Sequence, residues 1–319
     1  MEQPSINKLS FKHISIATKE AVKYIKDRKL HIINPLKTRW IKFNKACGGG
    51  LEPGTILTIA GSSGTGKSAF VNTLESDLID LNKGEDIVVL SFSFEMLSYR
   101  QIGRKLSNRL HQTTSELYSA ETDLTDSAFA DVEKTAENIK KYPIYYVDTP
   151  GTVEAIMNTI ESFANTIAKN KWLVIILDHA LLVDGDNERK TISDLQKLFI
   201  KVKKLPLCTI IQLSQMNRNN ESPERINNPS GHYPLRSDLF ASDSIFHASD
   251  YVVALSRPEL LGLTTYGPNR LLVKNKIYMH YLKVREGEPC ILEFENGLKY
   301  GDLIEPKHSI PEVKENTNI

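Results

Sequence analysis

AGSSGTGKSAF, residues 60–70, matches the phosphate-binding pattern G-x-x-x-x-G-K-[ST] in full. It follows TILTIAG (residues 55–61), which has the composition of a buried strand, and it begins a segment with helical periodicity (residues 67–84). A strand, a glycine-rich turn and a helix in this order direct backbone N–H groups and the positive end of the helix at one small volume. A flexible Gly/Ser turn with an incidental lysine would need neither neighbour, so a triphosphate-binding loop is the better interpretation. The residues expected to hold the nucleotide are Gly61, Ser62, Ser63, Gly64, Thr65, Gly66, Lys67, Ser68 and Ala69.

Apolar, strand-sized segments alternate with helical patterns from about residue 55 to residue 304. Near-continuous apolar strands separated by helices indicate a parallel sheet covered on both faces. In the last third of the chain, strands separated by Gly, Pro and Asn suggest hairpins that close one edge of the sheet. The expected fold class is therefore α/β, with a mostly parallel central sheet flanked by helices and C-terminal antiparallel hairpins. The expected strands are 55–61, 86–94, 142–148, 172–178, 208–214, 251–255, 270–284 and 290–296, and the expected helices are 67–84, 98–110, 153–170 and 192–205.

These patterns divide the chain into three parts. Residues 1–45 would form an N-terminal arm, with an amphipathic helix at about 18–30 followed by an irregular, glycine-rich linker. Residues 46–305 would form the ATPase domain. Residues 306–319 are a polar tail with the composition of a disordered segment.

Composition argues against several classes of protein. The chain has 319 residues and carries 40 Lys and Arg against 39 Asp and Glu, so nucleic-acid binding through a broad basic surface is not indicated. Its three cysteines, Cys47, Cys208 and Cys290, are far apart and odd in number, which favours reduced thiols in the cytoplasm over disulfides or a metal site. The first residues lack the apolar stretch of a signal peptide, and the longest apolar runs are too short to span a bilayer. We expect no membrane association.

Three polar residues end predicted strands. Asp178 ends the strand 172–178, where a carboxylate can hold the water shell of a Mg²⁺ ion that Ser68 also contacts; alternatively, it begins a turn. Glu95 follows the strand 86–94 and either takes a proton from an attacking water or favours the positive end of the next helix. Gln215 follows the strand 208–214 and is either a neutral sensor of the γ-phosphate or a polar residue that ends a strand.

Seven segments in order resemble the hexameric replicative DNA helicases of the DnaB type: GSSGTGKSAF, SFSFEM, YPIYYVDTPG, IILDHALLV, QLSQMNR, SDLFASDSIFHASDYVV and YLKVREG. The resemblance covers about residues 18–305. It implies a RecA-like P-loop ATPase core in the cytoplasm of a bacterial or phage-infected cell, assembled as a hexamer with ATP and Mg²⁺ bound between subunits. By position it makes Lys67 and Ser68 part of the P-loop, and it makes Glu95 the catalytic base. Asp178 becomes the Mg²⁺-associated acid and Gln215 the sensor.

The same resemblance gives Lys283 and Arg285, in YLKVREG, a role in the neighbouring subunit. A guanidinium delivered from outside stabilises the charge that develops on the transferred phosphoryl group, an effect of about 10³–10⁵ in rate in other systems. Without the resemblance, both would be interpreted as solvated charges of a hairpin. The helix at 18–30 matches the family's linker helix, which docks on an adjacent subunit; the alternative is packing on its own domain.

Residues 216–244 depart from the family pattern. In these helicases the region lines the ring channel and contacts single-stranded DNA, and it tends to read DLRESG where this chain reads DLFASD (residues 238–243). Phosphate-tracking loops normally carry positive charge, whereas this one is net −1, so its DNA contacts are not carried over. Phe240 could stack on a base, but buried packing is the preferred interpretation. The charged residues counted are Arg218, Arg225, Arg236, Glu221, Glu224, Asp238 and Asp243.

Only about forty-five residues precede the ATPase core, too few for the helical domain through which this family commonly engages primase. A primase or a helicase loader therefore remains a possible partner of a motor-only chain. Three functions are consistent with the sequence. The first is a ring-shaped motor that translocates on single-stranded DNA during replication. The second is a RecA-family ATPase that remodels nucleoprotein, and the third is a nucleotide-dependent assembly factor that does not unwind DNA.

Overall fold

The computed structural model describes residues 10–240 and 242–306 and divides the chain into two compact units, one ending at Pro35 and one beginning at Leu36. The first unit contains α1 (Ile14–Lys29), which has no buried residue. It begins four residues before the expected position, because the His13 ring caps it by accepting a hydrogen bond from the Ser15 backbone N–H. The predicted polar tail lies outside the described residues except for its first residue.

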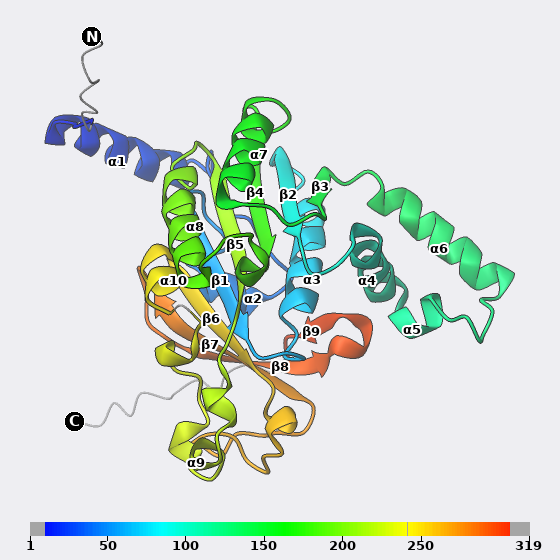
Figure 1. The fold of residues 1–319 in the computed structure, drawn as a ribbon. Coiled ribbons are helices and arrows are strands. Elements are labelled where there is room, and N and C mark those ends of the chain that lie inside the picture. The colour runs from blue at the N-terminus through cyan, green and yellow to red at the C-terminus, as the bar shows by residue number, and fades with distance from the viewer. Residues whose placement is uncertain (1–9, 241, 307–319) are drawn as a thin grey trace, which may run out of the picture. The chain divides into compact units, whose positions relative to one another are not determined.

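The second unit is built on a sheet whose nine described strands follow the order β3-β2-β4-β5-β1-β6-β7-β8-β9 (Figure 1). Strands β3 to β6 in this order are parallel, and β7, β8 and β9 continue the sheet as antiparallel hairpins at one edge. The expected fold class is thereby confirmed. The strands are β1 (Thr55–Gly61), β2 (Ile87–Ser93), β3 (Ile144–Val147), β4 (Trp172–Asp178), β5 (Cys208–Gln215), β6 (Tyr251–Ser256), β7 (Lys276–Val284), β8 (Ile291–Gly297) and β9 (Asp302–Ile304).

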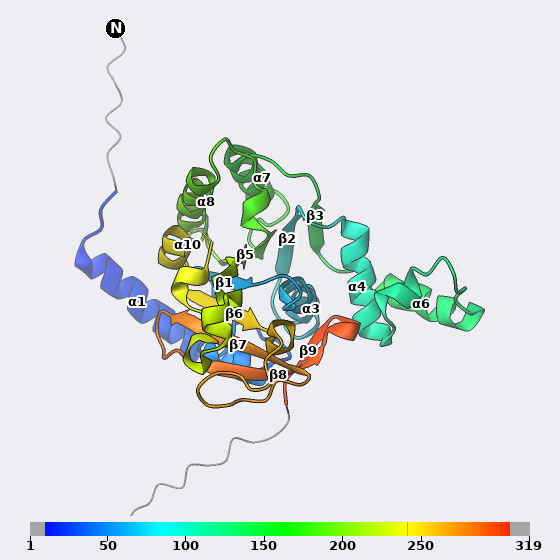
Figure 2. The same ribbon diagram turned by 60° about the horizontal axis from the view of Figure 1, so that its bottom comes forward.

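Helices cover both faces of this sheet. On β1, Leu57 packs in the same apolar cluster as Phe70 of α3, whereas its neighbour Ile56 packs with Ile160 of α7 and Phe199 of α8. Successive strand residues point to opposite faces, so α3 lies on one face and α7 and α8 lie on the other, as Figure 2 shows. The α-helices of this unit are α2 (Ile41–Ala46), α3 (Lys67–Asp80), α4 (Ser98–Leu110), α5 (Thr114–Leu117), α6 (Asp126–Ile139), α7 (Val153–Asn165), α8 (Glu188–Val202), α9 (Pro223–Ile226) and α10 (Ser242–Ala248).

Residues 36–51 are part of the core, not the irregular linker that the glycines suggested. Trp40 is 1% exposed and its ring stacks on Phe70 of the P-loop helix with 4.2 Å between the centroids. Phe43 and Cys47, from α2 and the residue after it, are fully buried in the same cluster. Apolar burial of this size holds the segment in place despite its poor local periodicity.

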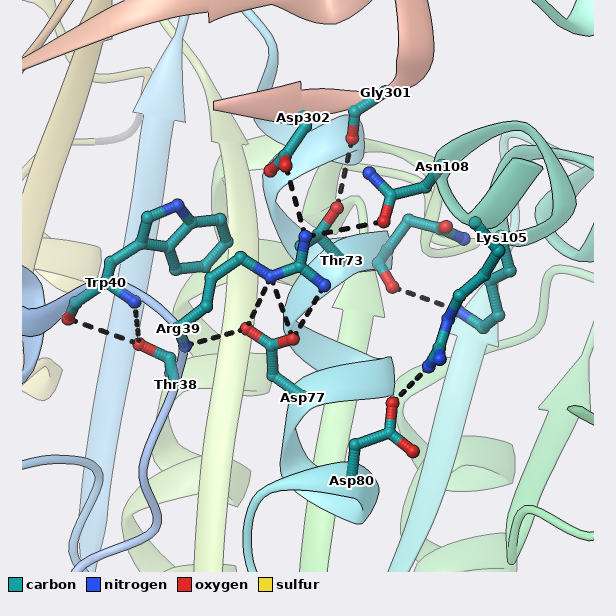
Figure 3. A network of polar contacts seen from close by, with 12 residues as sticks. Thr38, Arg39, Trp40, Thr73, Asp77, Asp80, Lys105, Asn108, Gly301 and Asp302 are labelled. Carbon is teal, nitrogen blue, oxygen red and sulfur yellow. Dashed lines mark hydrogen bonds and ion pairs between the residues drawn. The ribbon is translucent and has the colours of Figure 1, made fainter. Parts of the chain in front are cut away.

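A polar network fastens this segment to the P-loop helix and to the last strand (Figure 3). Arg39 binds Asp77 of α3 through Nε and Nη2, and its Nη1 lies 3.1 Å from Asp302 of β9. Asp77 is almost fully buried, so the paired guanidinium satisfies a charge that would be costly alone. Thr73, one turn earlier on α3, donates to the Gly301 carbonyl. The P-loop helix is therefore fixed from two distant parts of the chain.

The segment 216–240 is folded rather than an open loop. It contains α9 and three short 3₁₀ turns, and an isolated bridge between Met216 and Leu239 closes its base. Arg225 forms an ion pair with the buried Asp238 at 2.7 Å. Phe240 is partly buried against an apolar cluster, which agrees with the preferred packing interpretation. Part of the segment's positive charge is thus used inside the segment.

Two general expectations can be compared with the structure. The three cysteines are free thiols, with Cys47 and Cys208 buried and Cys290 half-buried, as the sequence predicted. Among residues 10–240 and 242–306, no helix is long and apolar enough to cross a membrane.

Candidate nucleotide-binding site

The glycine-rich loop connects β1 to α3 as the sequence predicted, and two of its glycines are required by geometry. Gly66 has a φ of 101°, in the left-handed region that other residues rarely adopt. A Cβ on Gly61 would lie 2.5 Å from Thr65 Oγ1 and 2.9 Å from the Leu255 carbonyl. The loop therefore wraps tightly, with the first turn of α3 beginning at Lys67.

The Lys67 ammonium folds back over this loop. Its Nζ donates to the carbonyl of Gly61 at 2.7 Å and to that of Ser62 at 3.0 Å. Burial lowers the pKa of Lys67, while the carboxylates of Asp178 and Glu95 oppose that shift. A cation at the N-terminal end of a helix, beside exposed backbone N–H groups, is suited to bind an anion of high charge.

Asp178 and Ser68 lie together at the end of β4. Burial and the neighbouring Glu95 raise the pKa of Asp178 to about 6, and a hydrogen bond from Ser68 opposes the shift. Among the described residues no group of three or more His, Cys, Asp or Glu could hold a metal ion. A hydroxyl and a carboxylate are oxygen ligands of the kind Mg²⁺ prefers, and Mg²⁺ is commonly shared with nucleotide phosphates. The two residues therefore fit a metal that arrives with the nucleotide.

Strands β2, β4 and β5 are neighbours, so the residues at their carboxyl ends meet. The Phe94 N–H donates to the Asp178 carbonyl at 3.0 Å, which holds the Glu95 turn against β4. Glu95 keeps 53% of its side chain exposed, as a group that must reach a ligand would. Gln215 lies on the same cavity wall. The structure thus brings together Lys67, Ser68, Glu95, Asp178 and Gln215, which the sequence predicted separately.

His179 was not predicted and sits between two of these residues. Its Nε2 lies 3.2 Å from Gln215 Nε2 and 3.9 Å from Glu95 Oε2. Burial lowers its pKa, so the ring is a neutral hydrogen-bonding group near pH 7. Its position directly after Asp178 was the only sequence signal for it.

A cavity of about 350 Å³ opens beside the P-loop, bounded by α3, α4, α5 and the turn after β8. Arg104 of α4 lines it and was also missed by the sequence reasoning. Burial lowers the pKa of Arg104, whereas Asp178 and Glu95 oppose the shift, so the guanidinium lies within the field of both carboxylates. Arg104 follows Glu95 on the next helix, a proximity that only the folded chain reveals. The cavity is large enough for a nucleotide.

Lys283 and Arg285 lie elsewhere. Arg285 Nε is 2.6 Å from Asp250 Oδ1, and the Asp250 N–H donates to the carbonyl of Ile56 at the beginning of β1. The P-loop follows the other end of β1, so about 15–20 Å of strand separate Arg285 from it, at roughly 3.3 Å per residue. Lys283 donates to the carbonyls of Phe246 and His247. Neither cation reaches its own subunit's P-loop.

Comparison with known proteins places the chain among nucleic-acid ATPases. Residues 35–297 match a family model described as the DnaB-like helicase C-terminal domain. A replicative DNA helicase DnaB of Mycoplasma genitalium is 28% identical over 266 residues, covering 79% of this chain and 53% of that protein. A DNA repair protein RadA of Halalkalibacterium halodurans is 31% identical over 149 residues, covering 44% of this chain and 31% of that protein. The chain spans about half or less of the length of these relatives.

Solved structures share the fold. One of them, described as an isolated ATPase domain, has a TM-score of 0.76 at 18% identity, covering 93% of this chain and all of that one. A DnaB-like replicative helicase studied with primase has a TM-score of 0.74 at 18% identity, covering 94% of this chain and 68% of that one. The KaiC-like protein PH0186 of Pyrococcus horikoshii has a TM-score of 0.52 at 17% identity, with 85% and 98% coverage. The RecA-like ATPase fold is confirmed.

Proposed function

This chain belongs to the DnaB-like helicase C-terminal domain family, and on that premise we propose that it is an ATP-driven DNA helicase motor of DNA replication. The observation that carries the proposal is the convergence of a P-loop lysine, a buried acid and an exposed glutamate at the ends of adjacent strands. The length match to its relatives is partial, so the proposal concerns the ATPase domain and the work that this domain performs.

In the proposed reaction the P-loop binds the phosphates of ATP, and Lys67 neutralises their charge. Ser68 and Asp178 would hold Mg²⁺, which supplies further positive charge to the phosphates when bound. Glu95 accepts the proton of the attacking water, and its exposed carboxylate faces the cavity where that water would lie. Gln215 contacts the γ-phosphate. Arg104, from the same subunit, contributes charge to the cavity wall.

Hydrolysis is proposed to occur between subunits of a homo-oligomeric ring, by the family pattern a hexamer. Lys283 and Arg285 lie at the edge of the sheet opposite the P-loop, so they can serve only the nucleotide of another copy. A head-to-tail contact that places this edge against the next P-loop repeats around a ring. Stabilisation of the developing charge by the added guanidinium would then make turnover depend on assembly.

The other parts of the chain have proposed roles in the same assembly. The arm, with α1 as a linker helix, would dock on the adjacent subunit, and residues 46–305 would be the motor. Single-stranded DNA would pass residues 216–244. Primase is a possible partner, because one structural neighbour was solved in a study of its interactions with primase.

A RecA-family ATPase that remodels nucleoprotein is the second candidate. The local similarity to RadA favours it, and so does the internal pairing of arginines in the segment 216–244. Both candidates hydrolyse ATP, but only the first opens a duplex.

The test is ATP turnover with and without single-stranded DNA, together with unwinding of a forked duplex. We expect DNA to stimulate turnover, the fork to open, and Lys67→Ala to abolish both activities. Lys197→Ala, which removes an exposed lysine paired with Asp194 on α8, is the matched control. Turnover without fork opening would favour the second candidate, and turnover that ignores DNA would contradict the motor.

A further inference from the structure

Phe246 on α10 lies beside two cations from different parts of the chain. The guanidinium carbon of Arg236, from the segment 216–240, is 4.5 Å from the centre of the Phe246 ring. The ammonium of Lys283, from the end of β7, is 5.2 Å from the same centre. Both distances are within the range of a cation–π contact. One aromatic ring therefore contacts the proposed DNA-facing segment and the proposed trans-acting hairpin.

The Lys283 contact is held by more than the ring. Its ammonium donates to the carbonyls of Phe246 and His247 at the end of α10. Phe246 itself is partly buried and packs against the cluster that contains Ile245, together with Leu282. A movement of the ring would therefore move the atoms that position Lys283.

The Arg236 contact is easier to break. Arg236 is 45% exposed and pairs with Asp243, which is 82% exposed, at 2.7 Å. Exposed ion pairs contribute little to stability, and arginine prefers bidentate contacts with phosphate. A DNA phosphate near this segment could therefore draw Arg236 away from both Asp243 and the ring.

Removing Arg236 would change the charge around Lys283. Burial lowers the pKa of Lys283, the neighbouring Arg285 lowers it further, and Lys203 and Arg236 add to the same effect. Asp250 opposes them, and it already pairs with both Lys203 and Arg285. Lys283 and Arg236 are thus like charges that share one ring, and departure of one strengthens the hold of the ring on the other.

We propose that Phe246 is a positioning residue that couples the segment 216–240 to Lys283, so that DNA contact with Arg236 sets the placement of the cation offered to the neighbouring ATP site. The inference rests on the proposed function and adds its regulation. It predicts that the stimulation of ATP turnover by single-stranded DNA depends on an aromatic ring at position 246.

The experiment compares Phe246→Leu, which keeps an apolar side chain but removes the ring, with Phe246→Tyr, which keeps the ring. The ratio of DNA-stimulated to unstimulated turnover is expected to fall about twofold to fivefold in Phe246→Leu, the size of one exposed cation–π contact. It is expected to stay near the wild-type ratio in Phe246→Tyr. Particle mass and thermal midpoint are measured for each variant, and Phe246→Met is a second ring-free variant should leucine prevent folding.

A double-mutant cycle separates coupling from packing. In an Arg236→Ala background, Phe246→Leu should cause no further loss of the stimulation ratio, because the contact it removes is already absent. A full additional loss in that background would overturn the proposal, and so would an unchanged ratio in both ring-free variants. Absence of DNA stimulation in the wild type would instead contradict the proposed function itself.

Discussion

The two edges of the parallel strands carry complementary chemistry. At the carboxyl edge, β1, β4 and β5 end in the P-loop, Asp178 and Gln215, which together surround a cavity. At the amino edge, Asp250 precedes β6 and holds Arg285, with Lys283 close by. One edge can bind a triphosphate but lacks the outside cation, and the other presents cations to no nucleotide of its own.

This difference shows why a single subunit is expected to be a poor ATPase. Complementary surfaces on opposite sides of one chain make head-to-tail contacts, which close as rings or extend as filaments. Each subunit then receives its missing cation from a neighbour, and assembly controls chemistry. Changes at one edge should therefore have effects different in kind from changes at the other.

The largest separation of the two edges is expected from Arg285→Ala. Turnover should fall by about 10³–10⁵-fold, because the transition-state charge loses its guanidinium, while the P-loop keeps its affinity for ATP. Steady-state turnover and ATP binding by calorimetry measure the two effects separately. A variant that binds ATP weakly, or one that turns over normally, would remove the distinction between the edges. Lys197→Ala again serves as the control.

Glu95→Gln tests the carboxyl edge. Turnover should fall by about 10²–10⁴-fold because the amide cannot accept the proton of water, and ATP binding should persist. Assembly should also persist, since Glu95 is half exposed and holds no structural partner in the hydrogen bonds described above. Single-turnover hydrolysis measures the chemical step directly. Glu161→Gln, an exposed site on α7, is the matched control. Unchanged single-turnover kinetics would mean that another group accepts the proton.

Asp250→Asn tests the amino edge more gently. Asp250 pairs with Arg285 at 2.6 Å and with Lys203 at 2.7 Å, so its charge positions the trans-acting hairpin. Loss of a charge-assisted partner should lower turnover by about tenfold, with ATP affinity unchanged. Asp194→Asn, at an exposed ion pair with Lys197, should have no such effect. Equal losses in both variants would show that the hairpin does not depend on Asp250.

The smallest expected effect concerns the sheet that both edges share. Burial lowers the pKa of His280 on β7 from 6.5 to about 3. Below pH 6.5 the unfolded chain binds a proton that the folded chain refuses, so the free energy of unfolding should fall with pH, by at most about 1.4 kcal/mol per pH unit. Denaturant unfolding at pH 7 and pH 5 measures it, with His280→Gln as the variant expected to flatten this dependence. The same pH dependence in both proteins would exclude His280 as its source.

Much of the carboxyl edge was predictable from sequence. The bounds of β1, α4 and β4 match the expected ranges, because each is an uninterrupted apolar run or a clearly periodic segment bounded by turns. Parallel strands end at one edge, so Glu95 and Asp178 could be expected to meet. His179 and Arg104 were missed because their roles come from three-dimensional proximity to these residues.

Other features could not be read from local pattern. Residues 36–51 look irregular, yet Trp40 and Phe43 are core residues, since their burial depends on α3 and β9. The segment that contains α5 and α6 was not predicted, and its helices bury few side chains, so they lack a strong apolar stripe. The pairing of Arg285 with Asp250 depends on strand register across the sheet, which a single sequence does not reveal.

The most direct test mixes two variants that are inactive for different reasons. Lys67→Ala subunits lack a working P-loop but keep Arg285, and Arg285→Ala subunits have the converse defect. Where subunits exchange, about a quarter of head-to-tail interfaces would combine an intact P-loop with an intact arginine, and turnover should return in the mixture. Mass measurement of mixed oligomers confirms the exchange. Mixed oligomers that hydrolyse no more ATP than either variant alone would contradict a site shared between subunits.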